Sequence, residues 1–295
     1  MSITLTQLRS FLAVVHGGSV TAAADALVVT QPSVSAAVGA LSREVGVALL
    51  ERDGRGVRPT PAGLEFAAYA ADVVGLLEQG RRAAAEAAGR AGRELRIAAV
   101  TTAAESFVPP LMRAFSRARP DVGLRLEVGN RDRVLAMVLG HEADVAVGGN
   151  PPRDGRIEAH AIRPNELVLI TAADDPLAGG APVAAAALGS RTWLLREPGS
   201  GTRLANEAFL ADVGVAAETL TLGSNGAIRQ AARAGLGISF VSRDAVVTEL
   251  DAGLLGVIAV AEPPATRQWY AMRSAAGPVR PAVTAFMEFV AGSQR

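Results

Sequence analysis

The sequence contains no cysteine and no lysine. Without cysteine the chain cannot form disulfides, thiolate metal sites or a cysteine nucleophile, which fits a reducing compartment. All 29 Lys+Arg residues are therefore arginine, whose planar guanidinium suits bidentate binding of phosphate, carboxylate or guanine. They balance 29 acidic residues, and a formal net charge of zero excludes nucleic-acid binding through bulk electrostatics alone.

Long hydrophobic runs and histidines are also scarce. No window holds about 18 consecutive apolar residues, and residues 1–20 lack the basic start and apolar core of a secretion signal, so we expect a cytoplasmic protein without a membrane partner. His16, His141 and His160 stand far apart without carboxylates at metal-ligand spacing. We therefore predict no metal, no cofactor and no catalytic residue.

The first 60 residues predict two short helices followed by a hairpin. Ser19 can cap a helix through the small residues 22–26, and Thr30 or Gln31 can cap a second helix with Pro32 in its first turn. The apolar stripe of that second helix repeats at helical spacing: Val34, Val38, Leu41 and Val45. This order is typical of a helix-turn-helix whose second helix presents its polar N-terminal face outward.

The hairpin predicted after these helices has the character of a wing. Residues 49–52 and 56–59 form its strands and carry Arg52, Arg55 and Arg58. A glycine-flanked arginine can reach a phosphate or a narrow minor groove. A small helical bundle with a solvated basic turn is the alternative interpretation, but the order helix, helix, wing favours DNA binding.

An ordered pattern across residues 8–63 resembles the winged helix-turn-helix of LysR-type transcriptional regulators. It comprises Leu8 to Val14, Gly18-Ser19, Ala22-Ala23-Ala24, Leu27, Thr30 to Ser35, Leu41, Leu49 to Arg52 and Thr60 to Gly63. The resemblance implies a long linker helix, a two-lobed effector domain, and assembly as a homodimer or homotetramer. It also implies double-stranded DNA, a small-molecule effector and RNA polymerase as partners.

The expected contacts with bases and phosphates come from Gln31, Pro32, Ser33, Ser35, Arg52, Arg55 and Thr60. The chain departs from the family where Ala36 and Ala37 replace bulky polar or basic side chains, so direct base contacts should be few. We place this DNA-binding domain at residues 1–60.

A linker or dimerisation helix is expected over residues 61–92. Its stripe of Phe66, Ala70, Val73 and Leu77 predicts pairing between two chains, although packing on its own domain is the alternative. At ~1.5 Å per residue such a helix reaches about 40 Å, more than a compact domain requires.

The remainder, residues 93–295, alternates strands with helices and predicts an α/β effector domain with parallel sheets and crossover helices. The expected strands are 94–100, 123–129, 144–148, 167–171, 192–195, 219–222, 238–241, 255–260 and 268–273. The expected helices are 106–118, 132–140, 202–213, 226–234, 243–252 and 279–291. Lobe I would comprise about 93–163 and 267–295, and lobe II about 164–266. This arrangement resembles the type 2 periplasmic-binding-protein fold.

A ligand site is expected between the lobes, where strand ends and helix N-termini meet. The candidates are Thr101, Thr102, Asn130, Gly149, Asn150, Ser200, Gly201, Thr202, Arg203 and Asn225. Arg203 would pair with a negatively charged ligand, whereas Arg131 and Arg133 either line the cleft or face solvent. The Gly199–Arg203 run also resembles the family branch that controls carbon-fixation or sulfur-assimilation operons, although a helix-capping turn without a ligand would have the same sequence.

The sequence thus predicts a sequence-specific DNA-binding transcriptional regulator, not an enzyme, switched by a small anionic metabolite between two lobes. An enzyme with Gly199–Arg203 as an anion cradle is disfavoured, because no phosphate-binding Gly-Lys loop, dinucleotide fingerprint or compact catalytic triad is present. A solute-binding protein of the cell envelope would share the fold but requires an export signal.

Overall fold

The computed structural model describes residues 2–54, 56–89 and 92–292. The chain divides into two compact units, Met1–Ala91 with Leu139–Glu142, and Gly92–Val138 with Ala143–Arg295. In the described residues no single helix is long and apolar enough to cross a membrane. The helices Val20–Leu27 and Gln31–Val45 reach the required length and apolar composition only when they are counted together, and the pair is bent by 108°.

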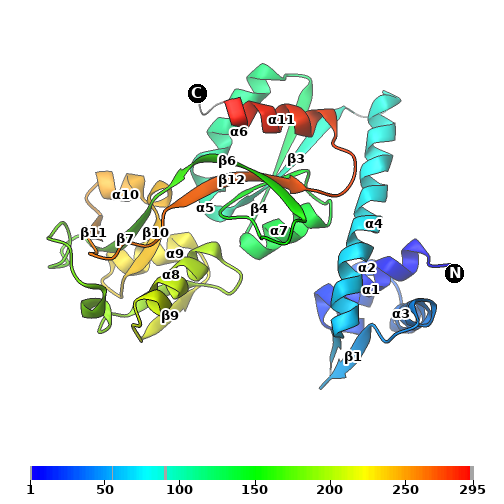
Figure 1. Cartoon of the computed structure of the whole chain (residues 1–295), viewed down its shortest axis with the longest axis horizontal. Coiled ribbons are helices and arrows are strands. Elements are labelled where there is room, and N and C mark those ends of the chain that lie inside the picture. Colours follow the sequence, from blue (N-terminus) through cyan, green and yellow to red (C-terminus); the bar gives the residue numbers. More distant parts are fainter. Residues whose placement is uncertain (1, 55, 90–91, 293–295) are drawn as a thin grey trace. The chain divides into compact units, whose positions relative to one another are not determined.

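The first unit contains three short helices, a hairpin and one long helix (Figure 1). Its elements are α1 (Leu5–Gly17), α2 (Val20–Leu27), α3 (Gln31–Val45), β1 (Leu50–Asp53), β2 (Gly56–Pro59) and α4 (Pro61–Ala87). Ser19 and Thr30 cap α2 and α3, since their hydroxyls accept hydrogen bonds from the amides of Ala22 and Ser33. The predicted helix-turn-helix and wing are confirmed, and Thr30 is the cap of α3.

The core of this unit forms where α1, α3 and the start of α4 pack together. Val34, Val38 and Leu41 are buried as predicted. Phe66 of α4 lies against Phe11 of α1 with ring centroids 5.8 Å apart, and Ala70 is only 1% exposed. The first half of the predicted dimerisation stripe therefore packs on its own domain, because the α1 to α3 core covers it.

A close backbone approach joins the wing to α4. A Cβ at Gly63 would lie 1.9 Å from the carbonyl oxygen of Leu49, so only glycine fits this position. On the other side of the wing, Val57 donates a backbone hydrogen bond of 3.2 Å to the oxygen of Gly18. These contacts fix the hairpin against the helices on both sides.

Lobe I of the second unit contains a five-stranded sheet in the order β4-β3-β5-β12-β6. Its strands are β3 (Arg93–Val100), β4 (Val122–Gly129), β5 (Val145–Gly148), β6 (Ile157–Asn165) and β12 (Arg267–Ser274), and its helices are α5 (Thr101–Glu105), α6 (Val108–Ala118), α7 (Arg131–Leu139) and α11 (Pro281–Gly292). Phe115 of α6 makes edge contacts with Phe286 and Phe289 of α11, at 5.1 and 5.5 Å. These rings pack α6 and α11 together over the sheet.

Lobe II is built around a second, smaller sheet. Its strands are β7 (Leu167–Ala172), β8 (Trp193–Arg196), β9 (Thr219–Leu222), β10 (Ser239–Ser242) and β11 (Leu255–Ile258). Its helices are η1 (Ala185–Leu188), α8 (Gly201–Asp212), α9 (Asn225–Arg233), η2 (Arg243–Ala245) and α10 (Val247–Asp251). A bridge from Trp193 to Ile238 joins the β8-β9 pair to β10-β7-β11. The rings of Trp193, Phe209 and Phe240 fill the space beneath α8.

The two-lobed α/β class is confirmed, but the expectation of parallel sheets is only partly right. β3, β4 and β5 are parallel, whereas β12 is antiparallel to β5 and β6, and β7 is antiparallel to β10 and β11. In lobe I the antiparallel pairs are those of β12, through which the chain returns after crossing to lobe II beyond β6. These two strands run side by side between the lobes in Figure 1.

Some details of the strand and helix assignment were wrong. The strand β6 and the short helices α5 and η1 were not predicted, and the helix expected over 243–252 is divided into η2 and α10. β6 is an edge strand with many exposed positions, so its sequence lacks the apolar run of a buried strand.

Candidate functional site

The N-terminal face of α3 presents the polar side chains expected to meet DNA. Gln31, Pro32, Ser33 and Ser35 are all exposed, while Val34 between them is buried. The hydroxyls of Thr30 and Ser33 lie 2.8 Å apart. The helix therefore has one face in the core and one small polar face open for docking.

The wing contributes fewer free cations than the sequence suggested. Arg52 is exposed, but Arg58 pairs with Glu51 at 2.9 Å across the hairpin, and Arg55 lies outside the described residues. Thr60 donates its hydroxyl hydrogen to the oxygen of Ala48 and accepts from the amide of Gly63, at 2.8 and 3.0 Å. Its hydroxyl thus caps α4 and has no hydrogen left to donate to a phosphate.

A small cavity of about 50 Å³ lies between the two lobes. It is lined by Val100, Thr101, Thr102, Asn130, Arg131, Gly149, Asn165, Leu167, Arg196, Ser200, Gly201, Thr202, Ser242, Arg267 and Trp269. Strand ends of lobe I and the N-terminus of α8 meet here, as the sequence predicted. A cavity of this size holds a compact polar molecule, since one water needs roughly 10–15 Å³ by the same measure.

The N-terminus of α8 is fixed in place by its own loop and by a buried amide. Ser200 caps the helix, accepting from the amide of Thr202 at 3.3 Å, and Gly199 takes the left-handed φ of +83° required before it. Asn206 exchanges hydrogen bonds of 2.8 and 2.9 Å with the backbone of Phe240. The α8 amides are thereby held rigidly at the cavity.

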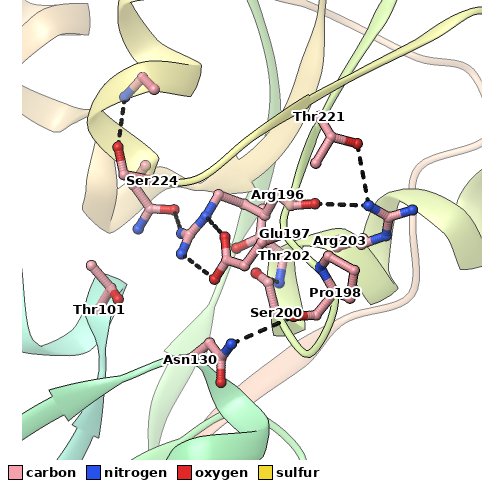
Figure 2. A network of polar contacts seen from close by, with 12 residues as sticks. Thr101, Asn130, Arg196, Glu197, Pro198, Ser200, Thr202, Arg203, Thr221 and Ser224 are labelled. Atoms are coloured by element: carbon pink, nitrogen blue, oxygen red, sulfur yellow. Dashed lines mark hydrogen bonds and ion pairs between the residues drawn. The ribbon is translucent and has the colours of Figure 1, made fainter. Parts of the chain in front are cut away.

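Several hydrogen bonds cross from one lobe to the other around the cavity. Asn225 donates to the hydroxyl of Thr102 at 2.8 Å, and the amide of Asp132 donates to the oxygen of Gly199 at 3.2 Å. Asn130 reaches the carbonyl oxygen of Pro198, a contact visible in Figure 2. The lobes therefore lie closed over the cavity.

Three arginines line the cavity, and one of them is neutralised locally. Arg196 is 4% exposed, binds both carboxylate oxygens of Glu197 at 2.7 and 2.9 Å, and donates to Asn225 (Figure 2). Burial acts to raise the pKa of Glu197, but the hydrogen bonds from Arg196 and from its own backbone outweigh burial and lower the pKa. Arg196 and Glu197 thus form a charge-balanced pair.

Arg267 and Arg131 are not balanced in this way. Arg267 donates to the oxygen of Gly201 at 3.3 Å, and no carboxylate of the described residues forms an ion pair with it. Burial lowers the pKa of Arg267, and the charge of Arg131 lowers it further. Arg131 has one long contact of 3.4 Å to the mostly exposed Asp132. The cavity therefore carries excess positive charge beside the α8 N-terminus.

Seven of the ten predicted effector-site residues line the cavity: Thr101, Thr102, Asn130, Gly149, Ser200, Gly201 and Thr202. Asn150 and Asn225 do not line it. Asn225 instead accepts a hydrogen bond from Arg196 and donates one to Thr102, two residues that do line the cavity. Arg203 does not line it. Its guanidinium donates to Glu207 at 2.7 Å. It also donates to the oxygen of Arg196 at 3.0 Å, a contact drawn in Figure 2.

The arginines that line the cavity without a buried carboxylate partner are therefore Arg131 and Arg267, and not Arg203 as expected. Arg131 had two open interpretations, and the structure places it in the lining. Arg267 was missed because nothing near it in the sequence marks a site, and only the return of β12 to lobe I brings it against Gly201. Among the side chains that the structure describes, no group of three histidine or acidic residues could hold a metal ion.

Comparison with known proteins gives two family matches that together cover most of the chain. Residues 5–64 match the bacterial regulatory helix-turn-helix protein of the lysR family, and residues 88–295 match the LysR substrate binding domain. The RuBisCO operon transcriptional regulator of Allochromatium vinosum is 38% identical over 291 residues, covering 98% of this chain and 96% of the relative.

Two solved structures are similar to this chain, one a regulatory domain that covers part of it and one a full-length regulator. The CcmR regulatory domain of Synechocystis PCC6803 in complex with 2-PG has a TM-score of 0.65 and 31% sequence identity. The match covers 68% of this chain and 97% of the CcmR domain. Full-length CbnR complexed with its target DNA has a TM-score of 0.55 and 25% identity, covering 99% of this chain and 100% of its own. With an exposed recognition helix, a wing and an interlobe cavity, the chain belongs to the LysR family of DNA-binding transcriptional regulators.

Proposed function

We propose that this regulator is switched by a small anion held between Arg131, Arg267 and the N-terminus of α8. The observation that carries the proposal is the partly buried Arg267, which has no carboxylate partner among the described residues. A bound anion would pair with both guanidiniums and with the α8 amides, and would reverse the unfavourable effect of burial and of Arg131 on Arg267.

The phosphate class fits this site best. Phosphate groups match a helix N-terminus and paired arginines, and the similar CcmR regulatory domain was solved in complex with 2-PG. The names of the relatives further support target genes of carbon fixation. A ligand that binds between two lobes can alter DNA affinity only by favouring one conformation of the assembly over another.

DNA binding would use α3 in the major groove, with Gln31, Pro32, Ser33 and Ser35 at the bases and phosphates, and the wing with Arg52 and Arg55 at the backbone. The small side chains Ala36 and Ala37 leave few direct base contacts, so DNA shape would supply part of the specificity.

The protein would act in the cytoplasm as a homo-oligomer that contacts RNA polymerase. On α4, Tyr69, Val73 and Leu77 are 68%, 52% and 43% exposed and recur at intervals of four residues on one face. Such an exposed apolar stripe on a long helix suits a second copy of the same helix, and a symmetric dimer supplies two recognition helices for two half-sites.

The test is titration of 2-PG, the ligand of the similar CcmR regulatory domain, into the full-length protein by isothermal titration calorimetry. Arg267→Met should weaken binding at least about tenfold, because it removes a buried charge-assisted contact worth more than ~1.4 kcal/mol. The same ligand should shift the protein's affinity for promoter DNA in an anisotropy assay by roughly 5- to 150-fold.

Arg203→Met is the matched control. It removes an arginine from α8 that is paired with Glu207 and does not line the cavity, so the affinity for 2-PG should stay close to the parent value. Loss of binding in Arg203→Met with normal binding in Arg267→Met would contradict the proposed site.

A further inference from the structure

The interlobe cavity contains a second polar feature that the anion does not use. Asn165 and Ser242 both line it, and each is 5% exposed. Asn165 Oδ1 and Ser242 Oγ have no hydrogen-bond partner among the described residues. Buried polar atoms are almost always paired, and each one left unpaired costs about 1–3 kcal/mol. Two such atoms in one cavity point to a ligand group that satisfies them.

Their positions in the sheets separate them from the anion-binding end. Asn165 is the last residue of β6 and lies opposite Arg267 in the β6-β12 ladder, at the backbone end of that arginine. The guanidinium of Arg267, at the other end of its side chain, reaches the oxygen of Gly201 on α8. Ser242 ends β10 and lies opposite Leu167, which also lines the cavity. The unpartnered oxygens therefore belong to the strand side of the cavity.

The chemistry of the two atoms selects one kind of ligand group. An amide oxygen only accepts a hydrogen bond, while a serine hydroxyl both donates and accepts. A ligand hydroxyl satisfies both, because it donates to Asn165 Oδ1 while accepting from Ser242. A methyl group would leave both unpaired.

We propose that the effector is a short bifunctional molecule with a phosphate-type anionic head at Arg131, Arg267 and α8, and a hydroxyl that bridges Asn165 and Ser242. The inference rests on the proposed function for the position of the head. It adds that the strand side of the cavity selects among phosphorylated compounds by their hydroxyl group. The cavity of about 50 Å³ limits the distance between the two groups to a short carbon chain.

Two phosphomonoesters with the same head test this selection. Glycerol 3-phosphate carries hydroxyls on its three-carbon chain, and propyl phosphate lacks them. In calorimetric titrations of the full-length protein, glycerol 3-phosphate should bind at least about tenfold more tightly, as two hydrogen bonds to otherwise unpaired buried atoms require. Equal affinities would overturn the hydroxyl site while leaving the anion site in place. Failure of both esters and of inorganic phosphate to bind would overturn the proposed function itself.

Variants then assign the preference to the two residues. Ser242→Ala and Asn165→Leu should each reduce the affinity for glycerol 3-phosphate toward that for propyl phosphate, whose own binding should change less than about twofold. Ser239→Ala is the matched control, since Ser239 is buried on the same strand but does not line the cavity. A preference for glycerol 3-phosphate that survives both substitutions would contradict the assignment of these residues.

Discussion

One residue in the helix-turn-helix adopts a backbone conformation that suits it poorly. Val28, the C-cap of α2, has φ +56° and ψ +48°, in the left-handed region. Glycine and asparagine accept this region, whereas a β-branched side chain there is strained by about 1–2 kcal/mol. Its side chain is 90% exposed, so no packing offsets the strain. The turn between the two helices is therefore held by the packing around it despite this residue.

Val28→Asn should accordingly stabilise the protein by about 1 kcal/mol, because asparagine reduces the strain and no buried contact is lost. The measurement is the midpoint of urea unfolding followed by circular dichroism. Val29→Asn is the control, since Val29 is the neighbouring exposed valine and does not have a positive φ. A gain of the same size in both variants would attribute the effect to surface polarity and not to the backbone.

At the scale of elements, glycines on α4 provide a matched pair for testing how the wing is anchored. Gly63→Ala should destabilise the N-terminal unit by about 2–3 kcal/mol and weaken DNA binding, because the added methyl group would overlap the carbonyl of Leu49 and displace the wing. Gly80 on the same helix has no atom within 4 Å of its ideal Cβ. Gly80→Ala should therefore stabilise the helix by about 0.5–1 kcal/mol.

Urea unfolding and gel retardation of the two variants measure these effects. Opposite signs for the two substitutions would separate close packing from helix propensity, since the chemical change is identical. A stable, DNA-binding Gly63→Ala protein would mean that the wing can shift without cost.

Elements defined by local signals were predictable from the sequence. The caps Ser19 and Thr30 and the start of α4 at Pro61 follow from side chains next to the backbone groups they serve. Elements defined by distant partners were not: β6 is stabilised as an edge strand by β12, about a hundred residues later. The direction of β12 likewise depends on how the chain returns from lobe II.

The same distinction applies to the candidate site. Thr101, Asn130 and Ser200 follow strand ends or cap helices, which a sequence pattern reveals. Arg267 and Ser242 reach the cavity only through the fold, so no local sequence pattern marks them. Arg203 was expected at the site because the sequence does not show that its guanidinium donates to Glu207, one helical turn later.

At the scale of the whole molecule, the proposed switch requires that a small ligand in one unit change how the DNA-binding units of a dimer are presented. A monomer could bind the effector, but it would offer a single recognition helix, whereas the proposed dimer would offer two. The exposed stripe of Tyr69, Val73 and Leu77 is the feature of the first unit suited to join two chains. Effector response and DNA affinity should therefore both depend on this stripe.

The double substitution Val73→Gln, Leu77→Gln tests this dependence. A symmetric dimer would lose four apolar side chains, so at about 0.7 kcal/mol each the dimer dissociation constant should rise roughly 100-fold in analytical ultracentrifugation. DNA affinity should fall with it, while binding of 2-PG should persist. Leu64→Gln is the control: Leu64 is 59% exposed on the same helix but about 140° around its axis from Leu77. Dimers that survive the double substitution but not Leu64→Gln would move the interface to the other face of α4.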